Sequence, residues 1–311
     1  MVGPSTGLSM FICNGTPSTE SSIKGTVFAL STRPIEILRD VIDKVIVVAY
    51  QEDVSKLVSS LKLEGFNVEI SRPDYSPEEM TYRRSSRCLL NHRNAWKRAL
   101  DHPRYTLICE ADFVPCRGIG DFEVFWPIEK VCAWGYLYQG SPRLLAMVGQ
   151  RPFLRGHNAT TVSYVINSTV ASLMLKFFEI EKGTYDFGSY FAWDAHLQWC
   201  VMGLGAEAFI PMRHYGEHGG TPNLEHGKLG RIGRDGRHRA DNLMNALHFL
   251  PQYANGSYLS YFRARVGARL SGFGRLLMGR WILETNVYNL SALDVIKMYL
   301  VGLRRLVSLP L

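Results

Sequence analysis

Two carboxylates follow a short strand-like segment in the first half of this chain. Residues 105–109 have the pattern of a strand covered on both faces, and Glu110 and Asp112 come directly after it. Residues at positions i and i+2 of an extended chain point to the same side, and in α/β sheets the ligand crevice lies at the carboxyl ends of the strands. Carboxylate oxygens there suit Mg²⁺ or Mn²⁺, which can neutralise a diphosphate. We therefore predict a metal site at Glu110 and Asp112; an acidic surface turn is the alternative.

The segments around this pair alternate between strand and helix patterns. The apolar run 45–48 predicts a strand buried on both faces, and hence a parallel sheet. A helix pattern follows, with Gly65 where a left-handed C-cap is expected, and then a second strand. The capping box at residues 76–79 predicts a long helix to about Asp101. Further elements are expected as strands at 131–138 and 161–166, a helix from Ser168 to Gly183, and a functional loop over 216–239.

The order of these features resembles glycosyltransferase family 25, which includes lipooligosaccharide and procollagen galactosyltransferases. That family has a Gly-Cys-x-x-Ser-His helix and then a hydrophobic strand ending in Glu-Asp-Asp; residues 87–96 and 107–112 are similar. Residues 163–167 (Ser-Tyr-Val-Ile-Asn) are similar to its Ala-Tyr-x-Ile-Asn strand, and Asp194 resembles the Asp that follows. The similarity spans residues 45–211. This chain departs from the family motifs at Arg87, Asn91 and Ala111, where the family has Gly, Ser and the middle acid.

The resemblance implies a GT-A-like fold, a nucleotide-sugar donor (a UDP-sugar above all) and a product of inverted anomeric configuration. It implies donor contacts from His92, Arg87 and Glu110, and Mn²⁺ or Mg²⁺ at Glu110 and Asp112. For His92, a buried and hydrogen-bonded position inside a helix is the alternative. Because Ala111 lacks the middle carboxylate, a non-catalytic carbohydrate- or nucleotide-binding relative is the alternative function.

Asp194 is the candidate general base. In an inverting sugar transfer a carboxylate takes the proton of the acceptor hydroxyl as that oxygen attacks the anomeric carbon. Asp194 precedes an amphipathic segment, so a helix N-cap is the alternative role.

A late histidine-rich segment offers further metal ligands. His214, Glu217 and His218 match H-x-x-E-H, the inverted zinc-protease motif, which requires a helix. Gly216 inside the motif and two glycines after it favour a loop, so a zinc hydrolase is the lesser alternative. We predict instead that a late histidine, His214 or His218 (with His226 as a further option), joins the carboxylates, since Mn²⁺ accepts imidazole.

Arginines interleave with glycines just after this segment. Arg231 and Arg234 are predicted to close over the diphosphate of the donor with bidentate contacts. A solvated basic loop is the alternative.

Composition and charge narrow the function classes. The chain is 46% hydrophobic and 20% charged, as expected of a folded globular protein. We expect no secretory signal and no transmembrane helix, and the scattered cysteines favour the cytoplasm. From Tyr261 to the end, eight basic and two acidic residues give a net charge of +6, which argues against a nucleic-acid-binding core and for an anionic partner of the tail.

The tail ends in an amphipathic helix pattern. The capping box at Ser291 precedes an apolar stripe from Ile296 to Val307, with basic residues opposite. Such a helix can lie on an anionic membrane surface, here the inner face of the membrane; packing on the core is the alternative.

The predicted organisation is a weakly ordered lead-in (1–25), a GT-A-like domain (26–260) and a basic helical extension (261–311). The expected fold is α/β, with a mixed, mostly parallel sheet flanked by helices. The predicted function is transfer of a sugar from a nucleotide sugar to a glycan or lipid-linked acceptor, in bacterial surface polysaccharide or lipopolysaccharide synthesis.

Overall fold

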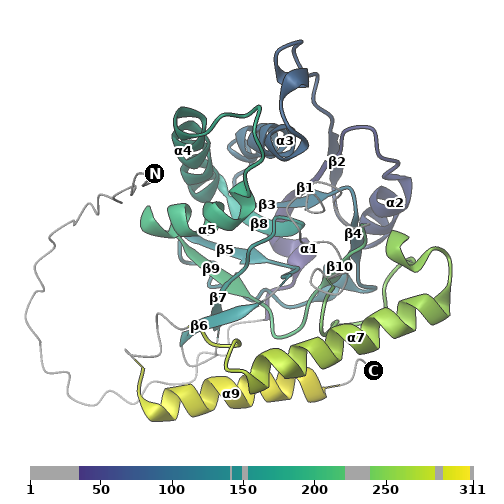
Figure 1. Ribbon diagram of the computed structural model, residues 1–311, viewed down its shortest axis with the longest axis vertical. Coiled ribbons are helices and arrows are strands. Elements are labelled where there is room, and N and C mark those ends of the chain that lie inside the picture. The colour runs from purple at the N-terminus through teal and green to yellow at the C-terminus, as the bar shows by residue number, and fades with distance from the viewer. Residues whose placement is uncertain (1–34, 141, 149–152, 221–238, 284–289, 309–311) are drawn as a thin grey trace, which may run out of the picture. The chain divides into compact units, whose positions relative to one another are not determined.

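An eight-stranded sheet runs through the described part of the chain (Figure 1). The computed structural model describes residues 35–140, 142–148, 153–220, 239–283 and 290–308, so the predicted lead-in 1–25 lies outside the described residues. The strand order is β2-β1-β3-β8-β5-β9-β7-β6. The strands are β1 (Ile42–Val48), β2 (Val68–Ser71), β3 (Tyr105–Glu110), β5 (Ala133–Tyr136), β6 (Arg143–Val148), β7 (Phe153–His157), β8 (Ser163–Asn167) and β9 (Glu207–Ile210).

The sheet is mixed and mostly parallel. Strands β1, β2 and β3 are parallel neighbours, and β5 is parallel to β9. Strand β8 runs antiparallel to β3 and β5, and β7 antiparallel to β9 and β6. Six of the eight strands therefore point the same way. Helices cover the sheet and two long helices follow it near the C-terminus, which confirms the predicted fold class.

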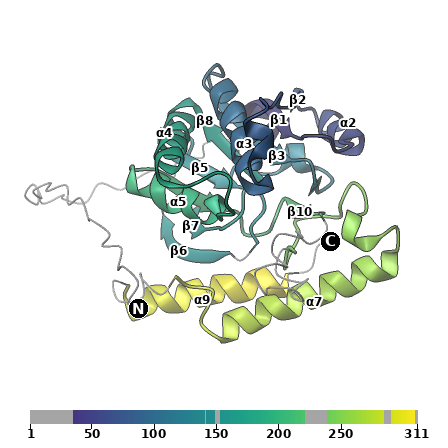
Figure 2. The same ribbon diagram turned by 45° about the horizontal axis from the view of Figure 1, so that its top comes forward.

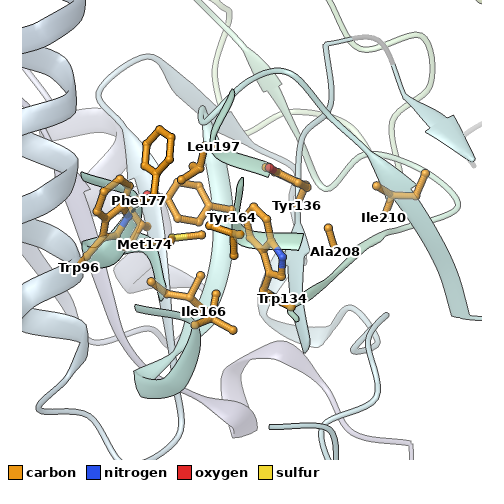
Figure 3. Packing of buried hydrophobic residues seen from close by; sticks show 14 of the residues in the cluster. Trp96, Trp134, Tyr136, Tyr164, Ile166, Met174, Phe177, Leu197, Ala208 and Ile210 are labelled. Atoms are coloured by element: carbon orange, nitrogen blue, oxygen red, sulfur yellow. Dashed lines mark hydrogen bonds between the residues drawn. The ribbon is translucent and has the colours of Figure 1, made fainter. Parts of the chain in front are cut away.

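The helices close two hydrophobic cores, one on each face of the sheet. Ile46 and Val48 belong to one core, whereas Val45 and Val47 belong to the other. Neighbouring residues of a strand face opposite ways, so a strand covered on both faces must be apolar throughout. Trp96, Tyr164 and Phe177 pack in the first core (Figure 3). The helices are α1 (Leu38–Val41), α2 (Ser55–Leu63), α3 (Arg84–Ala99), α4 (Ser168–Thr184), α5 (Trp193–Gly203), α7 (Tyr258–Leu277) and α9 (Ala292–Val307), with single 3₁₀ turns η1 (Glu79–Thr81), η2 (Ile119–Asp121) and η3 (Gln252–Ala254).

The helix expected from the capping box begins later than predicted. The box itself forms: the Ser76 N–H donates to Glu79 Oε2 at 2.9 Å, and the Glu79 N–H donates to Ser76 Oγ at 3.2 Å. Only the 3₁₀ turn η1 follows, and α3 starts at Arg84. The Arg83 N–H donates to the Phe187 carbonyl at 3.0 Å, which holds the chain extended there. A tertiary contact therefore overrides the local signal.

One face of each C-terminal helix packs against the rest of the unit. On α9 the residues Met298, Gly302, Arg305 and Leu306 are buried. Arg305 pairs with Asp241 at 2.8 Å, and on α7 Arg265 pairs with the buried Glu217 at 2.9 Å. Residues Ile35–Leu311, these helices included, cluster as one unit. None of the helices within the described residues has the length and apolarity needed to span a bilayer.

Candidate active site

A second, two-stranded sheet brings a late histidine to the carboxylates after β3. The chain turns at Ala111 and Asp112 into β4 (Phe113–Pro115), which pairs antiparallel with β10 (Gly216–His218) (Figure 1). The register pairs His218 with Phe113, so the histidine lies beside Asp112. Its Nε2 is 2.9 Å from Asp112 Oδ2. Of the two late histidines that the structure describes here, His214 and His218, it brings His218 to the predicted metal carboxylate. His226 lies outside the described residues.

Two glycines closely approach Asp112, and one oxygen of the Asp112 carboxylate has no partner among the described residues. Its Oδ1 is buried and has no hydrogen-bond partner among the described residues. The Gly219 N–H donates to the Asp112 carbonyl at 2.8 Å, and a Cβ on Gly220 would lie 2.2 Å from Oδ2. Because a buried carboxylate oxygen without a partner is costly, this atom is suited to an incoming cation. Burial lowers the pKa of His218, but the adjacent Asp112 carboxylate outweighs it and raises this pKa to about 9.

Glu110 is held by a chain of buried hydrogen bonds. Its Oε1 accepts from Thr161 Oγ1 at 2.8 Å and lies 3.2 Å from Nε2 of His92. Trp96 can only donate, so the Tyr164 hydroxyl accepts from it at 2.7 Å and supplies its own proton to His92 Nδ1 at 2.8 Å. This leaves the proton of His92 on Nε2, directed at Glu110.

The structure places His92 in the buried, hydrogen-bonded position that was the alternative to a donor contact. Its side chain is 0% exposed, so it lies behind Glu110 and does not face solvent where a donor would bind. Its contact with Glu110 holds the orientation of that carboxylate.

Asp194 lies in the same group of acids. It stands in the first turn of α5, whose N-cap is Ala192, so the alternative role as an N-cap is wrong. Its Oδ1 accepts the neighbouring Ala195 N–H at 3.0 Å. Burial, and then the negative charge of Glu110, raise the pKa of Asp194 to about 6. A carboxylate with this pKa can accept a proton near neutral pH.

Cys88 is a member of the site that the motif analysis did not single out. Among the described residues, ligand atoms of Cys88, His92 and Glu110 all lie within 4.8 Å of one another. Cys88 and His92 are one helical turn apart on α3 and so share a face. This i, i+4 spacing, immediately before the strand that ends in Glu110, was the available signal. Burial, and then Glu110, raise the pKa of the thiol well above its usual value.

Arg87 stands over two aromatic rings near the carboxyl end of β1. Its guanidinium carbon is 6.0 Å from the ring centre of Tyr50 and 5.9 Å from that of Tyr75. The two rings are 5.3 Å apart. Arg231 and Arg234, predicted to contact the donor, lie outside the described residues.

The structure argues against the alternative zinc hydrolase and against His214 as a ligand. Residues 216–218 form a strand, not a helix, so Glu217 and His218 point to opposite sides. The buried Glu217 pairs with Arg265. Both ring nitrogens of His214 are engaged, one by the Gln139 N–H at 3.2 Å and one with Asp241 at 3.0 Å. Burial, and then Arg305, lower the pKa of His214 to about 4.

Comparisons with known proteins give structural similarity only. No protein-family model matches the chain, and no curated protein is similar to it. One similar solved structure is a glycosyltransferase involved in the glycosylation of the major capsid of PBCV-1: 8% identity, TM-score 0.35, 54% of this chain and 80% of that one covered. Another is the CTP:phosphocholine cytidylyltransferase of Streptococcus pneumoniae: 8% identity, TM-score 0.32, 55% and 89% covered. Neither identifies an activity here, and the resemblance to family 25 stays a prediction from the motifs.

Proposed function

We propose that this chain transfers a glycosyl group from a nucleotide sugar to an acceptor hydroxyl, with the help of a divalent cation. The observation that carries the proposal is that two acids of the site, Asp112 and Asp194, have different surroundings. Asp112 pairs with His218 and has a buried oxygen that the described residues leave without a partner, whereas Asp194 lies on α5 and has a raised pKa. One carboxylate is thus suited to a cation, and the other to a proton.

Asp112 and His218, with Glu110 from the strand, would hold Mn²⁺ or Mg²⁺. Two carboxylates and an imidazole are a ligand set that Mn²⁺ accepts. When bound, the ion would neutralise charge on the nucleoside diphosphate as it leaves. His92 and Thr161 both contact Oε1 of Glu110 and so fix the orientation of this carboxylate.

Asp194 would act on the acceptor. As the acceptor oxygen bonds to the anomeric carbon and the bond to the diphosphate breaks, the hydroxyl proton passes to the Asp194 carboxylate. Inversion at the anomeric carbon follows from the resemblance to family 25. The acceptor is proposed to be a glycan or lipid-linked saccharide of a bacterial surface polysaccharide.

The donor would approach from the carboxyl ends of β1 and β3. Tyr50 and Tyr75 offer aromatic faces, and Arg87 lies over both rings. Such a set suits a nucleobase such as uracil. Arg231 and Arg234 remain candidates for the diphosphate.

The test of the proposal is a screen of sugar nucleotides by thermal unfolding, with and without Mn²⁺, followed by a turnover assay. A donor that binds only the folded protein raises the melting temperature by mass action. We expect the UDP-sugars to do so in the presence of Mn²⁺, and one of them to be consumed when acceptor is added. Stabilisation without any turnover would favour the non-catalytic alternative. No stabilisation by any sugar nucleotide would contradict the proposal.

Replacing the proposed base should slow transfer but spare donor binding. In Asp194→Asn we expect the rate to fall at least about a hundredfold, because the amide cannot take the acceptor proton. Wild-type activity should decline as the pH falls through about 6, since only the ionised carboxylate accepts a proton, and the variant should lack this decline. Asp101→Asn, an exposed carboxylate elsewhere, is the control. Transfer within a few-fold of wild type would make Asp194 a structural residue.

A further inference from the structure

The long helix α7 carries its large apolar side chains on the outside. Three of the four residues that it buries are small, namely Ala264, Ala268 and Gly272, and the fourth is Leu276. A helix that packs only on its own core shows the reverse arrangement. The exposed apolar side chains lie three, four or seven residues apart, so they share the opposite face of the helix. They are Leu259, Phe262, Val266, Leu270 and Leu277, between 43% and 85% exposed.

Helix α9 carries a similar exposed apolar stripe, although it also buries Met298 and Leu306. It buries Gly302, whose added Cβ would lie 2.8 Å from Leu276 of α7, and it also buries Arg305. Its exposed apolar residues, 45% to 59% exposed, are Leu293, Ile296, Leu300, Leu303 and Val307. Figures 1 and 2 show α7 and α9 side by side along one edge of the described unit. We call the two exposed stripes together the C-terminal apolar face.

The charges beside this face are positive. Helix α7 has no acidic residue, and α9 has Asp294 as its sole acid. Three of the four arginines of α7 bind partners on its buried side, which leaves Arg263 exposed. Three exposed cations on the two helices and their connection are Arg263, Arg280 and Arg304. An apolar stripe with basic neighbours matches an anionic lipid surface, where acyl chains and negative head groups meet.

A basic pocket opens on the flank of α7 beside the stripe. Its volume is about 450 Å³, and Arg239, Tyr253, Ser260 and Arg263 supply its polar lining. The guanidinium of Arg239 stacks 4.4 Å from the ring centre of Tyr253. Two guanidinium groups and the Ser260 hydroxyl in one pocket provide donors for a phosphate.

We propose that the C-terminal apolar face and this pocket dock the protein on an anionic bilayer. The apolar side chains enter the boundary between head groups and acyl chains, and the pocket receives a lipid phosphate. Tyr253 also donates to Glu217 at 3.2 Å, and the next residue, His218, pairs with Asp112. Docking therefore places the candidate active site close to the lipid surface. The binding itself does not depend on the proposed transferase activity.

The test is co-sedimentation of the full chain with vesicles of phosphatidylcholine alone or mixed with phosphatidylglycerol. We expect binding to the anionic vesicles, weakened but not abolished by high salt, because salt screens only the charges. The double variant Phe262→Glu with Leu300→Glu should bind at least about tenfold more weakly. The matched control, Leu63→Glu with Val131→Glu, makes the same charge change at exposed apolar sites elsewhere and should bind as wild type.

The pocket has its own pair of variants. Arg263→Ser should weaken binding to anionic vesicles about fivefold, whereas Lys62→Ser on α2 should leave it unchanged. All four variants alter exposed side chains, and melting curves should match that of the wild type. Absence of the wild type from both vesicle pellets would overturn the proposal, as would equal binding by the stripe variant and its control. A wild-type dimer that becomes monomeric in the stripe variant, without vesicle binding, would assign the face to a second copy of this chain.

Discussion

Asp112→Asn should abolish the effect of Mn²⁺ on donor binding while the protein stays folded. The amide is nearly the same size, but it lacks the negative charge that a cation requires at this position. Loss of a direct ligand should reduce metal-dependent affinity by more than about a hundredfold, beyond what loss of an outer partner costs. Titration calorimetry with the sugar nucleotide, at zero and saturating Mn²⁺, measures the change.

Two comparisons make this result specific. Asp101→Asn, at an exposed carboxylate outside the site, should bind donor and metal as the wild type does. Because the Asp112 carboxylate raises the pKa of His218 to about 9, NMR titration of this histidine should show a lower pKa in Asp112→Asn. If the histidine responds but Mn²⁺-dependent affinity is unchanged, Asp112 is a structural partner of His218 and the metal lies elsewhere.

Arg305→Ala should destabilise the fold by about 3–5 kcal/mol, the usual cost of breaking a buried ion pair. The Arg305 side chain is 1% exposed, pairs with Asp241 at 2.8 Å and donates to the Met212 carbonyl at 2.9 Å. Without Arg305, the Asp241 carboxylate, which is 3% exposed, has only Arg275 and His214 as partners among the described residues. The Met212 carbonyl also loses the hydrogen bond from Arg305. Urea unfolding of the variant and the wild type measures the loss.

The neighbouring arginine is the control. Arg304 is exposed, so Arg304→Ala should change the free energy of unfolding by less than about 0.5 kcal/mol. Burial raises the pKa of Asp241, but Arg305 and His214 lower this pKa by more than burial raises it. The pKa of Asp241 therefore lies well below 3.8. This pair therefore contributes stability above about pH 3.8, and the difference between wild type and Arg305→Ala should shrink as the pH falls below that value. Equal destabilisation by both substitutions would mean that the buried network is not what fixes α9.

The sequence alone determined the local features of this protein. The apolar run of β1 required a strand covered on both faces, and Gly65, with φ +89°, ends α2 as its position indicated. Ser291 caps α9 through the Asp294 N–H at 3.2 Å. Glu110 and Asp112 could be singled out as candidate site residues because an apolar strand followed by two acids is visible within residues 105–112. Each of these signals is short in sequence, and short-range sterics and hydrogen bonds decide them.

Only the tertiary structure decided which distant residues join them. His214 and His218 are equally plausible in the sequence, but the pairing of β4 with β10 places His218 at Asp112, and the buried arginine of α9 occupies the surroundings of His214. The burial of His92 behind Glu110 likewise depends on Tyr164, 72 residues away. For the C-terminal helices, the pattern showed an apolar stripe but not which face would be covered. The buried faces contain small residues, the Arg305–Asp241 ion pair and a few large side chains such as Met298 and Leu306, and the small residues allow close approach of the helices. Most of the large apolar side chains of the two helices face outward. Strand register and helix rotation are set by contacts between segments far apart in the chain, and no local pattern contains them.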